Sequence, residues 1–119
     1  MLADNNSQDF LDMQIENGVI ELDAATYVRG RSYGSSLCIF DEFQNMTKHE
    51  AKSILTRIGF GSKIVILGDI EQIDAKNLDF FSNGLSYVIE KFKPYPIAAH
   101  ITLTKGERSE LATIASEIL

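Results

Sequence analysis

The chain has 119 residues, of which 45% are hydrophobic and 24% are charged, and its formal net charge is −6. This length allows one small domain, and the composition is typical of folded globular proteins and not of disordered or fibrous chains. No apolar run is long enough to cross a bilayer, and the acidic start is unlike a basic signal peptide. We therefore expect a cytoplasmic protein with no membrane partner, and the single cysteine, Cys38, fits a reducing compartment.

The charge is distributed unevenly along the sequence. Between Arg29 and Lys63 there are six basic and three acidic residues, whereas the remainder has five basic and fourteen acidic residues. Clustered cations are what phosphate groups require, but a locally basic stretch also occurs on ordinary solvated surfaces. The pattern leaves both interpretations open.

The first part of the chain predicts little regular structure. Apolar residues within 1–17 indicate a short helix that ends at Asn17 and Gly18, and we expect residues 1–17 to be a flexible end. A β-branched run at 19–22 predicts a short strand, and a loop rich in glycine, serine and arginine follows it at 29–36.

The rest of the chain alternates between two patterns. Apolar or β-rich runs predict three strands, the first two of which lack alternation and so favour burial on both faces. Helical spacing of apolar residues predicts three helices, the first of which starts with a capping box of Thr47 and Glu50. The strands are expected at 37–40, 64–67 and 98–103, and the helices at 47–58, 83–92 and 109–119.

Strands and helices in strict alternation predict a parallel sheet with right-handed crossovers, that is, an open α/β fold. Ligands of such sheets bind beyond the carboxyl ends of the strands. The residues that follow each predicted strand are therefore the candidates for chemistry.

Carboxylates follow two of the predicted strands. Asp41 and Glu42 end the first, and Asp69 follows the second after Gly68. Neighbouring strands would bring these three side chains to one edge of the sheet, about 5 to 10 Å apart. An apolar strand that ends in Asp-Glu has the form of a Walker B element, in which Asp holds Mg2+ and Glu polarises the attacking water. Capping of loops or helices by the same aspartates is the alternative.

Four further motifs follow one another along the chain. They are Arg29-Gly30-Arg31-Ser32, the run 40–45 around Asp41 and Glu42, the run 55–63 that contains Arg57, and Gly68-Asp69-Ile70-Glu71-Gln72-Ile73-Asp74. In this order they resemble the PhoH-like ATPases, the phosphate-starvation-inducible protein family. The resemblance covers residues 18–119, and its last part, at 82–85 and 100–109, is similar to the branch that often carries an N-terminal PIN nuclease domain.

The resemblance implies a P-loop NTPase related to superfamily 1 helicases, with ATP and Mg2+ as cofactors. It implies that Asp41 binds nucleotide and metal and that Glu42 is catalytic. Gly68, Asp69 and Gln72 would form a sensor like helicase motif III, with the first two contacting the cofactor and Gln72 acting in catalysis. Arg57 and Arg108 are candidates for an arginine that stabilises the transferred phosphoryl group. The alternative for Arg57 is a cation that interacts with a helix C-terminus, and the alternative for Arg108 is a surface or capping role.

The sequence departs from the family pattern in two places. Phe43 stands where the family usually has alanine, and no Gly-x-x-x-x-Gly-Lys-Ser/Thr loop occurs in the chain. Without that loop, the amides and lysine that hold the terminal phosphates are missing. We therefore expect residues 1–119 to be the C-terminal part of a three-layer, RecA-like ATPase domain, inactive alone, whose first strands and P-loop lie upstream.

The implied partners are the upstream P-loop half of the same protein, RNA or single-stranded nucleic acid, and other copies of the protein in a homo-hexamer. Two alternatives remain open. One is a metal-dependent nuclease or phosphotransfer domain that uses Asp41, Glu42 and Asp69. The other is a non-catalytic assembly module.

Overall fold

The computed structural model describes residues 5–23 and 32–119 of the chain. The predicted loop at 29–36 lies partly outside these residues, as do Arg29 and Arg31. The described elements, in order, are α1 (Asn5–Glu16), β1 (Leu37–Phe40), the short 3-10 helix η2 (Phe43–Asn45), α2 (Lys48–Leu55), β2 (Lys63–Ile66), α3 (Gly84–Phe92) and α4 (Glu110–Ile118).

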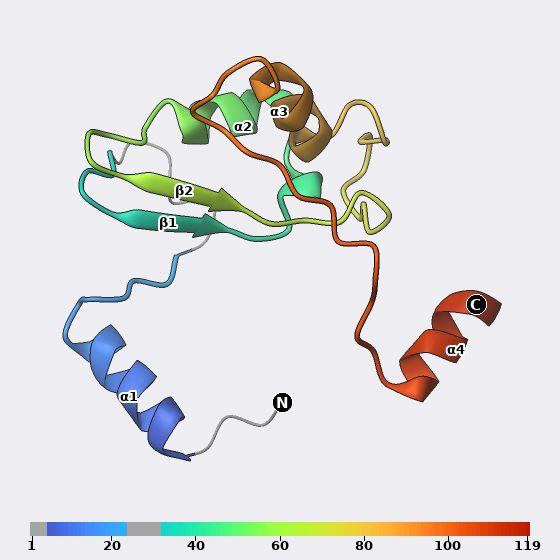
Figure 1. The fold of residues 1–119 in the computed structure, drawn as a ribbon, viewed down its shortest axis with the longest axis horizontal. Coiled ribbons are helices and arrows are strands. Elements are labelled where there is room, and N and C mark those ends of the chain that lie inside the picture. Colours follow the sequence, from blue (N-terminus) through green and yellow to red (C-terminus); the bar gives the residue numbers. More distant parts are fainter. Residues whose placement is uncertain (1–4, 24–31) are drawn as a thin grey trace.

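The centre of the molecule is a β1–α2–β2 unit (Figure 1). The two strands pair in parallel, with Leu37 opposite Lys63 and Phe40 opposite Ile66. This pairing confirms the predicted parallel arrangement. An isolated parallel bridge between Tyr33 and Ile58 extends the contact before the strands begin.

Helix α2 starts as the sequence predicts. The Thr47 hydroxyl accepts a hydrogen bond from the Glu50 backbone N–H, and the Glu50 carboxylate accepts one from the Thr47 N–H, which completes a capping box. The helix is shorter than the predicted 47–58 and ends at Leu55, where Thr56 is its C-cap. Helix α3 begins after the N-cap Asn83, and α4 after the N-cap Ser109.

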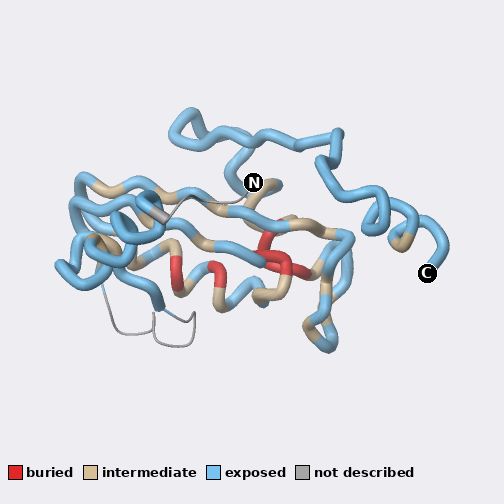
Figure 2. The backbone as a smooth tube through the Cα atoms, turned by 90° about the horizontal axis from the view of Figure 1, so that it is seen from below, coloured by how far each residue is buried: buried red, intermediate tan, exposed pale blue. Residues whose placement is uncertain are grey.

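The core lies on one side of the sheet. Its buried apolar residues come from η2, α2 and α3, and partly buried Phe40, Ile64 and Ile66 pack against them. Figure 2 shows the buried positions gathered in this region. The buried apolar side chains of this core are Phe43, Ala51, Ile54 and Leu85.

Phe43, the larger residue at a position where alanine was expected, fills the centre of this core. Its side chain is fully buried and meets the Phe40 ring edge to face, with centroids 6.2 Å apart. Such a contact adds about 0.5–1.5 kcal/mol to the apolar burial. The ring therefore repacks the space beneath the sheet.

The prediction that β1 and β2 are buried on both faces is wrong. Both strands alternate between exposed and half-buried residues, and Leu37 and Ile39 are 65% and 61% exposed. The reason is that α2 and α3 cover only the face that carries Cys38, Phe40, Ile64 and Ile66. The other face of the sheet is uncovered within the described part of the chain.

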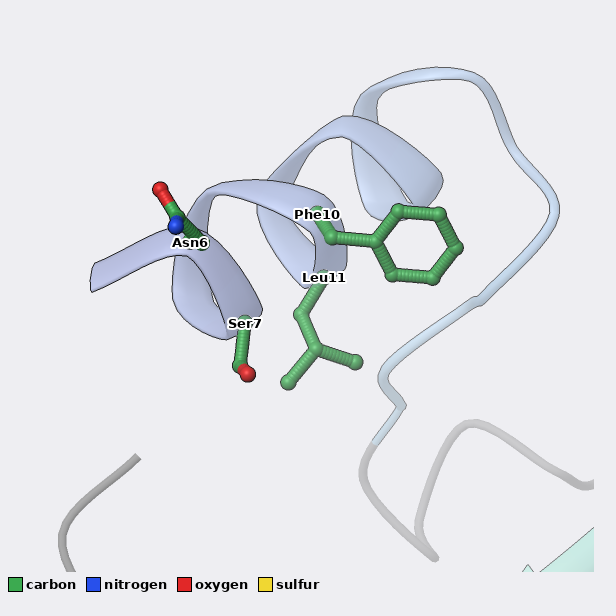
Figure 3. Close-up of a pocket in the computed structure, with 4 residues that line it drawn as sticks. All are labelled: Asn6, Ser7, Phe10 and Leu11. Atoms are coloured by element: carbon green, nitrogen blue, oxygen red, sulfur yellow. The ribbon is translucent and has the colours of Figure 1, made fainter. Parts of the chain in front are cut away.

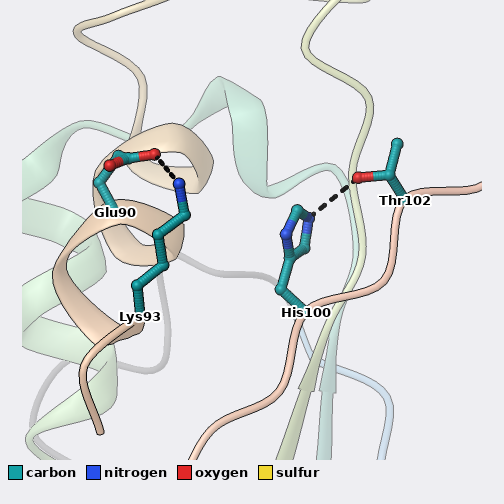
Figure 4. A network of polar contacts seen from close by, with 4 residues as sticks. All are labelled: Glu90, Lys93, His100 and Thr102. Carbon is teal, nitrogen blue, oxygen red and sulfur yellow. Dashed lines mark hydrogen bonds and ion pairs between the residues drawn. The ribbon is translucent and has the colours of Figure 1, made fainter.

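The strands predicted at 19–22 and 98–103 are also absent from the structure, and the sheet has two strands. Residues 98–103 are all exposed, and the side-chain contact between His100 Nε2 and Thr102 Oγ1, at 3.4 Å, is local to the segment (Figure 4). Strands gain their stability from cross-strand pairing, and this extended segment has no partner strand among the described residues. The same picture shows the surface-exposed ion pair between Glu90 of α3 and Lys93, the C-cap of that helix.

Helices α1 and α4 confirm two predicted helices but lie away from the core (Figure 1). Helix α1 ends in a Schellman motif, because Gly18 adopts φ +72° and Val19 N–H donates to the Gln14 carbonyl at 3.0 Å. Residues of α4 are exposed apart from the half-buried Ala115. None of the helices in residues 5–23 and 32–119 has the length and apolar character that a membrane span requires.

Candidate functional site

The candidate site lies at the carboxyl ends of β1 and β2, where open α/β sheets bind ligands. Asp41 and Glu42 follow β1, and Gly68 and Asp69 follow β2 after Leu67. The two strand ends are joined by hydrogen bonds from Leu67 N to Phe40 O at 2.8 Å and from Phe43 N to Leu67 O at 3.1 Å. The predicted convergence of these two segments is therefore present.

Glu42 adopts an unusual backbone conformation. Its φ and ψ are 55° and 34°, in the left-handed region, where a residue other than glycine is strained by about 1 kcal/mol or more. Its N–H donates to Asp41 Oδ1 at 2.8 Å, which holds the turn. The turn places both carboxylates at the exposed surface, immediately before η2.

Gln44 joins the two segments of the site. This side chain is fully buried, and its Nε2 donates to Glu42 Oε2 at 2.6 Å and to the Gln72 carbonyl at 3.1 Å. Its Oε1 accepts a hydrogen bond from Asp69 N at 3.1 Å. One amide thus brings together Glu42, Asp69 and Gln72, three residues that the sequence predicted for the site.

Asn45 provides a second link to the same loop. Its Oδ1 accepts hydrogen bonds from the backbone N–H groups of Asp74 and Ala75, at 2.8 and 3.1 Å. Sequence reasoning assigned no role to Gln44 or Asn45. The available signal was a pair of uncharged polar residues between a strand end and a capping box, where side-chain amides commonly tie loops together.

The loop after β2 is also ordered from within. Asp69 Oδ1 accepts from Glu71 N at 2.9 Å, and Asp69 Oδ2 accepts from Gln72 Nε2 at 2.9 Å. Gly68 is required here by space, because a Cβ at this position would lie 2.5 Å from Gln44 Oε1 and 2.9 Å from Leu85 Cδ2. The contacts of Gly68 and Asp69 in this structure are therefore with the protein's own loops.

Asp41, Glu42 and Asp69 follow the two paired strands at one edge of the sheet. Asp69 accepts hydrogen bonds within its own loop, and Glu42 accepts one from Gln44. Among residues 5–23 and 32–119, no three Asp, Glu, His or Cys side chains are grouped so that they could hold a metal ion.

Asp41 alone nevertheless fits the way in which Mg2+ is bound together with a phosphate ligand. Mg2+ keeps several waters and is commonly held by one or two carboxylates together with substrate phosphates. Asp41 is exposed, and one of its oxygens accepts only the adjacent Glu42 N–H. A single aspartate of this type fits a metal whose other ligands are water and phosphate.

Arg57 lies at the other end of the sheet from Asp41 and Glu42. Arg57 follows α2 near the start of β2, so the length of a strand, about 13 Å for four residues, separates it from Asp41. Its Nη1 donates to the Ser53 carbonyl and to Ser53 Oγ, contacts that place the cation at the C-terminal end of α2. Arg108 is exposed, just before the N-cap of α4.

A shallow hollow lined by Asn6, Ser7, Phe10 and Leu11 occurs on α1 (Figure 3). All four residues lie on one exposed helix, away from the carboxyl ends of the strands. The hollow contains no carboxylate or cation. It is therefore not a candidate for the chemistry of the site.

The geometry defines an α/β protein with an acidic strand end joined by a buried amide to the loop of the neighbouring strand. Comparison with known proteins is consistent with this class. The family described as "PhoH-like protein" matches residues 1–118, and the chain belongs to this family.

Curated relatives support the same assignment. The chain is 54% identical over 102 residues to "Protein PhoH2" of Bacillus subtilis, and the aligned region is 86% of this chain and 23% of that protein. It is 37% identical over 109 residues to "Protein PhoH2" of Mycolicibacterium smegmatis, where the aligned region is 92% of this chain and 25% of the relative. It is also 44% identical over 73 residues to a "PhoH-like protein" of Bacillus subtilis, where the aligned region is 61% of this chain and 23% of the relative. The chain thus spans about a quarter of the length of these relatives.

Proposed function

We propose that this chain is the C-terminal part of an ATP-hydrolysing PhoH-like domain that remodels RNA, with Asp41 and Glu42 as its Walker B pair. The observation that carries the proposal is the hydrogen-bonded connection from Glu42 through Gln44 to Asp69 and the Gln72 carbonyl. This connection lies at the strand ends where α/β sheets bind ligands. The family resemblance supports the choice of ATP as the ligand.

Each residue has a distinct task in this proposal. Asp41 would hold Mg2+, which when bound neutralises charge on the nucleotide phosphates. The Glu42 carboxylate orients the attacking water and accepts its proton, and Gln44 fixes the direction of that carboxylate by its 2.6 Å hydrogen bond. The loop of Gly68, Asp69 and Gln72 would respond to the terminal phosphate because it is bonded to the same amide.

The strained backbone of Glu42 supports the assignment of a special role to this residue. A glutamate in the left-handed region is unfavourable, and such residues occur where the surrounding structure holds a functional side chain in place. Here the Asp41 carboxylate and the Gln44 amide hold it from either side.

The remaining partners are part of the same proposal and rest on the family resemblance. They are the P-loop half of the protein, RNA or single-stranded nucleic acid, and further copies in a homo-hexamer. Arg57 and Arg108 are the candidates in this chain for an arginine that acts on the phosphoryl group, within one copy or across an interface between copies. The P-loop half would supply the amides that hold the phosphates.

The first test replaces Glu42 by Gln in the full-length protein. We expect ATP binding to be retained and the hydrolysis rate to fall at least about 100-fold, because a general base is lost while the shape is kept. Glu71→Gln is the matched control, since Glu71 is an exposed carboxylate on the loop and is expected to leave turnover unchanged. Wild-type turnover by Glu42→Gln would remove Glu42 from the mechanism.

The second test is a calorimetric titration of Mg-ATP into the 119-residue chain and into its Asp41→Ala variant. We expect no detectable binding to either, because the phosphate-binding loop is not in this chain. Tight binding that is lost in Asp41→Ala would show a complete nucleotide site here and would contradict the half-site proposal.

A further inference from the structure

A fully exposed aromatic ring marks the turn between α2 and β2. Phe60 is 100% exposed and lies between Gly59 and Gly61, of which Gly61 adopts φ +72°. We name residues 59–62 the aromatic tip. It lies at the opposite end of the sheet from Asp41 and Glu42, because it immediately precedes β2.

The backbone of the aromatic tip is held firmly. The Phe60 carbonyl accepts a hydrogen bond from Ser35 N at 3.0 Å, and Ser62 Oγ accepts one from Ser36 N at 3.0 Å while it donates to the Tyr33 carbonyl at 3.0 Å. The ring is therefore presented on a bonded turn and needs no ordering of the backbone when it binds. Preorganisation of this kind lowers the entropic cost of association.

The residues around this end of the sheet include no acidic residue. Residues 32–37 and 56–63 carry Arg57 and Lys63 and neither aspartate nor glutamate, in a chain whose net charge is −6. Lys63 is exposed. In the described part of the chain, the ion pairs join Lys93 to Glu90 and Lys105 to Glu107, so Lys63 is not neutralised by a carboxylate there.

We infer that the aromatic tip is a contact point for single-stranded nucleic acid, with Phe60 stacked on a base and Lys63 next to a phosphate. A planar apolar ring on a turn that leads directly into an exposed lysine complements a chain of bases and phosphates, and stacking accepts any base. The inference rests on the nucleic-acid partner of the proposed function, and it identifies where on this chain the contact occurs.

A second exposed aromatic site supplies the contrast. Phe80 and Phe81 form an edge-to-face pair with centroids 5.3 Å apart, and Phe81 is 81% exposed. This pair is adjacent to Asp79, whose carboxylate accepts hydrogen bonds from the Phe81 and Ser82 N–H groups. A fixed negative charge beside the rings repels phosphates, so Phe81 should not take part.

The experiment measures the fluorescence anisotropy of a labelled 15-nucleotide single-stranded RNA titrated with the 119-residue chain at low salt, without nucleotide. Phe60→Ala should weaken binding at least about fivefold, since stacking is worth about 1–3 kcal/mol per base. Phe60→Trp should keep the affinity, and Phe81→Ala should stay within twofold of wild type. Lys63→Gln should reduce the slope of log affinity against log salt by about 0.7.

Three outcomes would overturn the inference. They are no binding by the wild-type chain, equal effects of Phe60→Ala and Phe81→Ala, or an unchanged affinity in Phe60→Ala together with a loss of self-association in sedimentation. The last result would assign the ring to a contact between copies of the protein. Because no nucleotide is present, this test succeeds or fails separately from the ATPase test on Glu42.

Discussion

The Gln44 amide nitrogen lies 2.6 Å from Glu42 Oε2, and the other end of the same amide accepts a hydrogen bond from the Asp69 backbone. This side chain is fully buried, and two of its three hydrogen bonds, to the Gln72 carbonyl and from Asp69 N, cross from the segment after β1 to the loop after β2. The position of the candidate catalytic carboxylate is therefore coupled to the loop of the neighbouring strand. Movement of one loop changes the hydrogen bonds of the other.

Replacement of Gln44 by alanine should lower the free energy of unfolding by about 2–3 kcal/mol, because buried partners lose their hydrogen bonds and a cavity remains. Urea denaturation followed by circular dichroism measures this. Gln72→Ala is the control: the Gln72 side chain is exposed and bonds only to Asp69, so its loss should stay below about 1 kcal/mol. Equal losses in the two variants would contradict a central role for Gln44.

Replacement of Gly68 by alanine should destabilise the protein by about 1–3 kcal/mol, because the new methyl group would collide with Gln44 Oε1 and Leu85. The same substitution in a Gln44→Ala background should cost less, since one of the colliding groups is gone, and a double-mutant cycle measures the difference. Gly106→Ala meets no atom within 4 Å and serves as the control. Additive effects of the two substitutions would show that the Gln44 side chain is not what requires glycine at this position.

Asn83 is a fully buried N-cap, and its replacement by alanine should cost about 2–4 kcal/mol. Its Nδ2 donates to the Asp79 and Phe80 carbonyls and its Oδ1 accepts from Ser86 N, all at 2.9 Å. Ser109→Ala removes the matching cap of α4, which packs on no core residue, and should leave the global unfolding transition nearly unchanged. A shift of that transition by Ser109→Ala as large as that by Asn83→Ala would disprove this ranking.

Acid should remove a contribution of Asp79 to stability. Hydrogen bonds from the Ser82 backbone and hydroxyl, and from the Phe81 backbone, lower the pKa of Asp79 below its ordinary value of 3.8. A lowered folded-state pKa stabilises the fold fully above the unfolded pKa, and this contribution is lost as the pH falls through the folded value. Asp79→Ala should therefore be less stable than wild type at pH 6, and the difference should shrink toward pH 3. A difference that is constant between these pH values would contradict the assignment.

Local signals predicted much of the fold. The signals for the paired runs of β1 and β2, for the capping box of Thr47 and Glu50, and for helices that begin near residues 83 and 109 lie within a few residues of the elements they define. The strand at 98–103 failed because a strand depends on a partner that a sequence pattern does not name. Burial of β1 on both faces was predicted wrongly for a related reason, because an apolar run does not show whether another element covers each face of the strand.

The candidate site was predictable in outline and not in detail. Two strands that run in parallel necessarily bring their carboxyl ends together, so Glu42 and Asp69 could be paired from topology alone. The direction of each carboxylate could not, because it is set by single hydrogen bonds from Gln44 and from the Asp69 loop itself. The position of Arg57 likewise follows from the end of α2, three residues before the predicted boundary.

The uncovered face of the sheet has a consequence for colloidal behaviour. Leu37, Ile39 and Val65 present an apolar surface to water, and repulsion between molecules of net charge −6 opposes its association at neutral pH. Near the isoelectric point of about 4.8 this repulsion disappears. Light scattering of the isolated chain should therefore rise as the pH approaches that value, and added salt, which screens the charge, should bring the onset closer to neutrality.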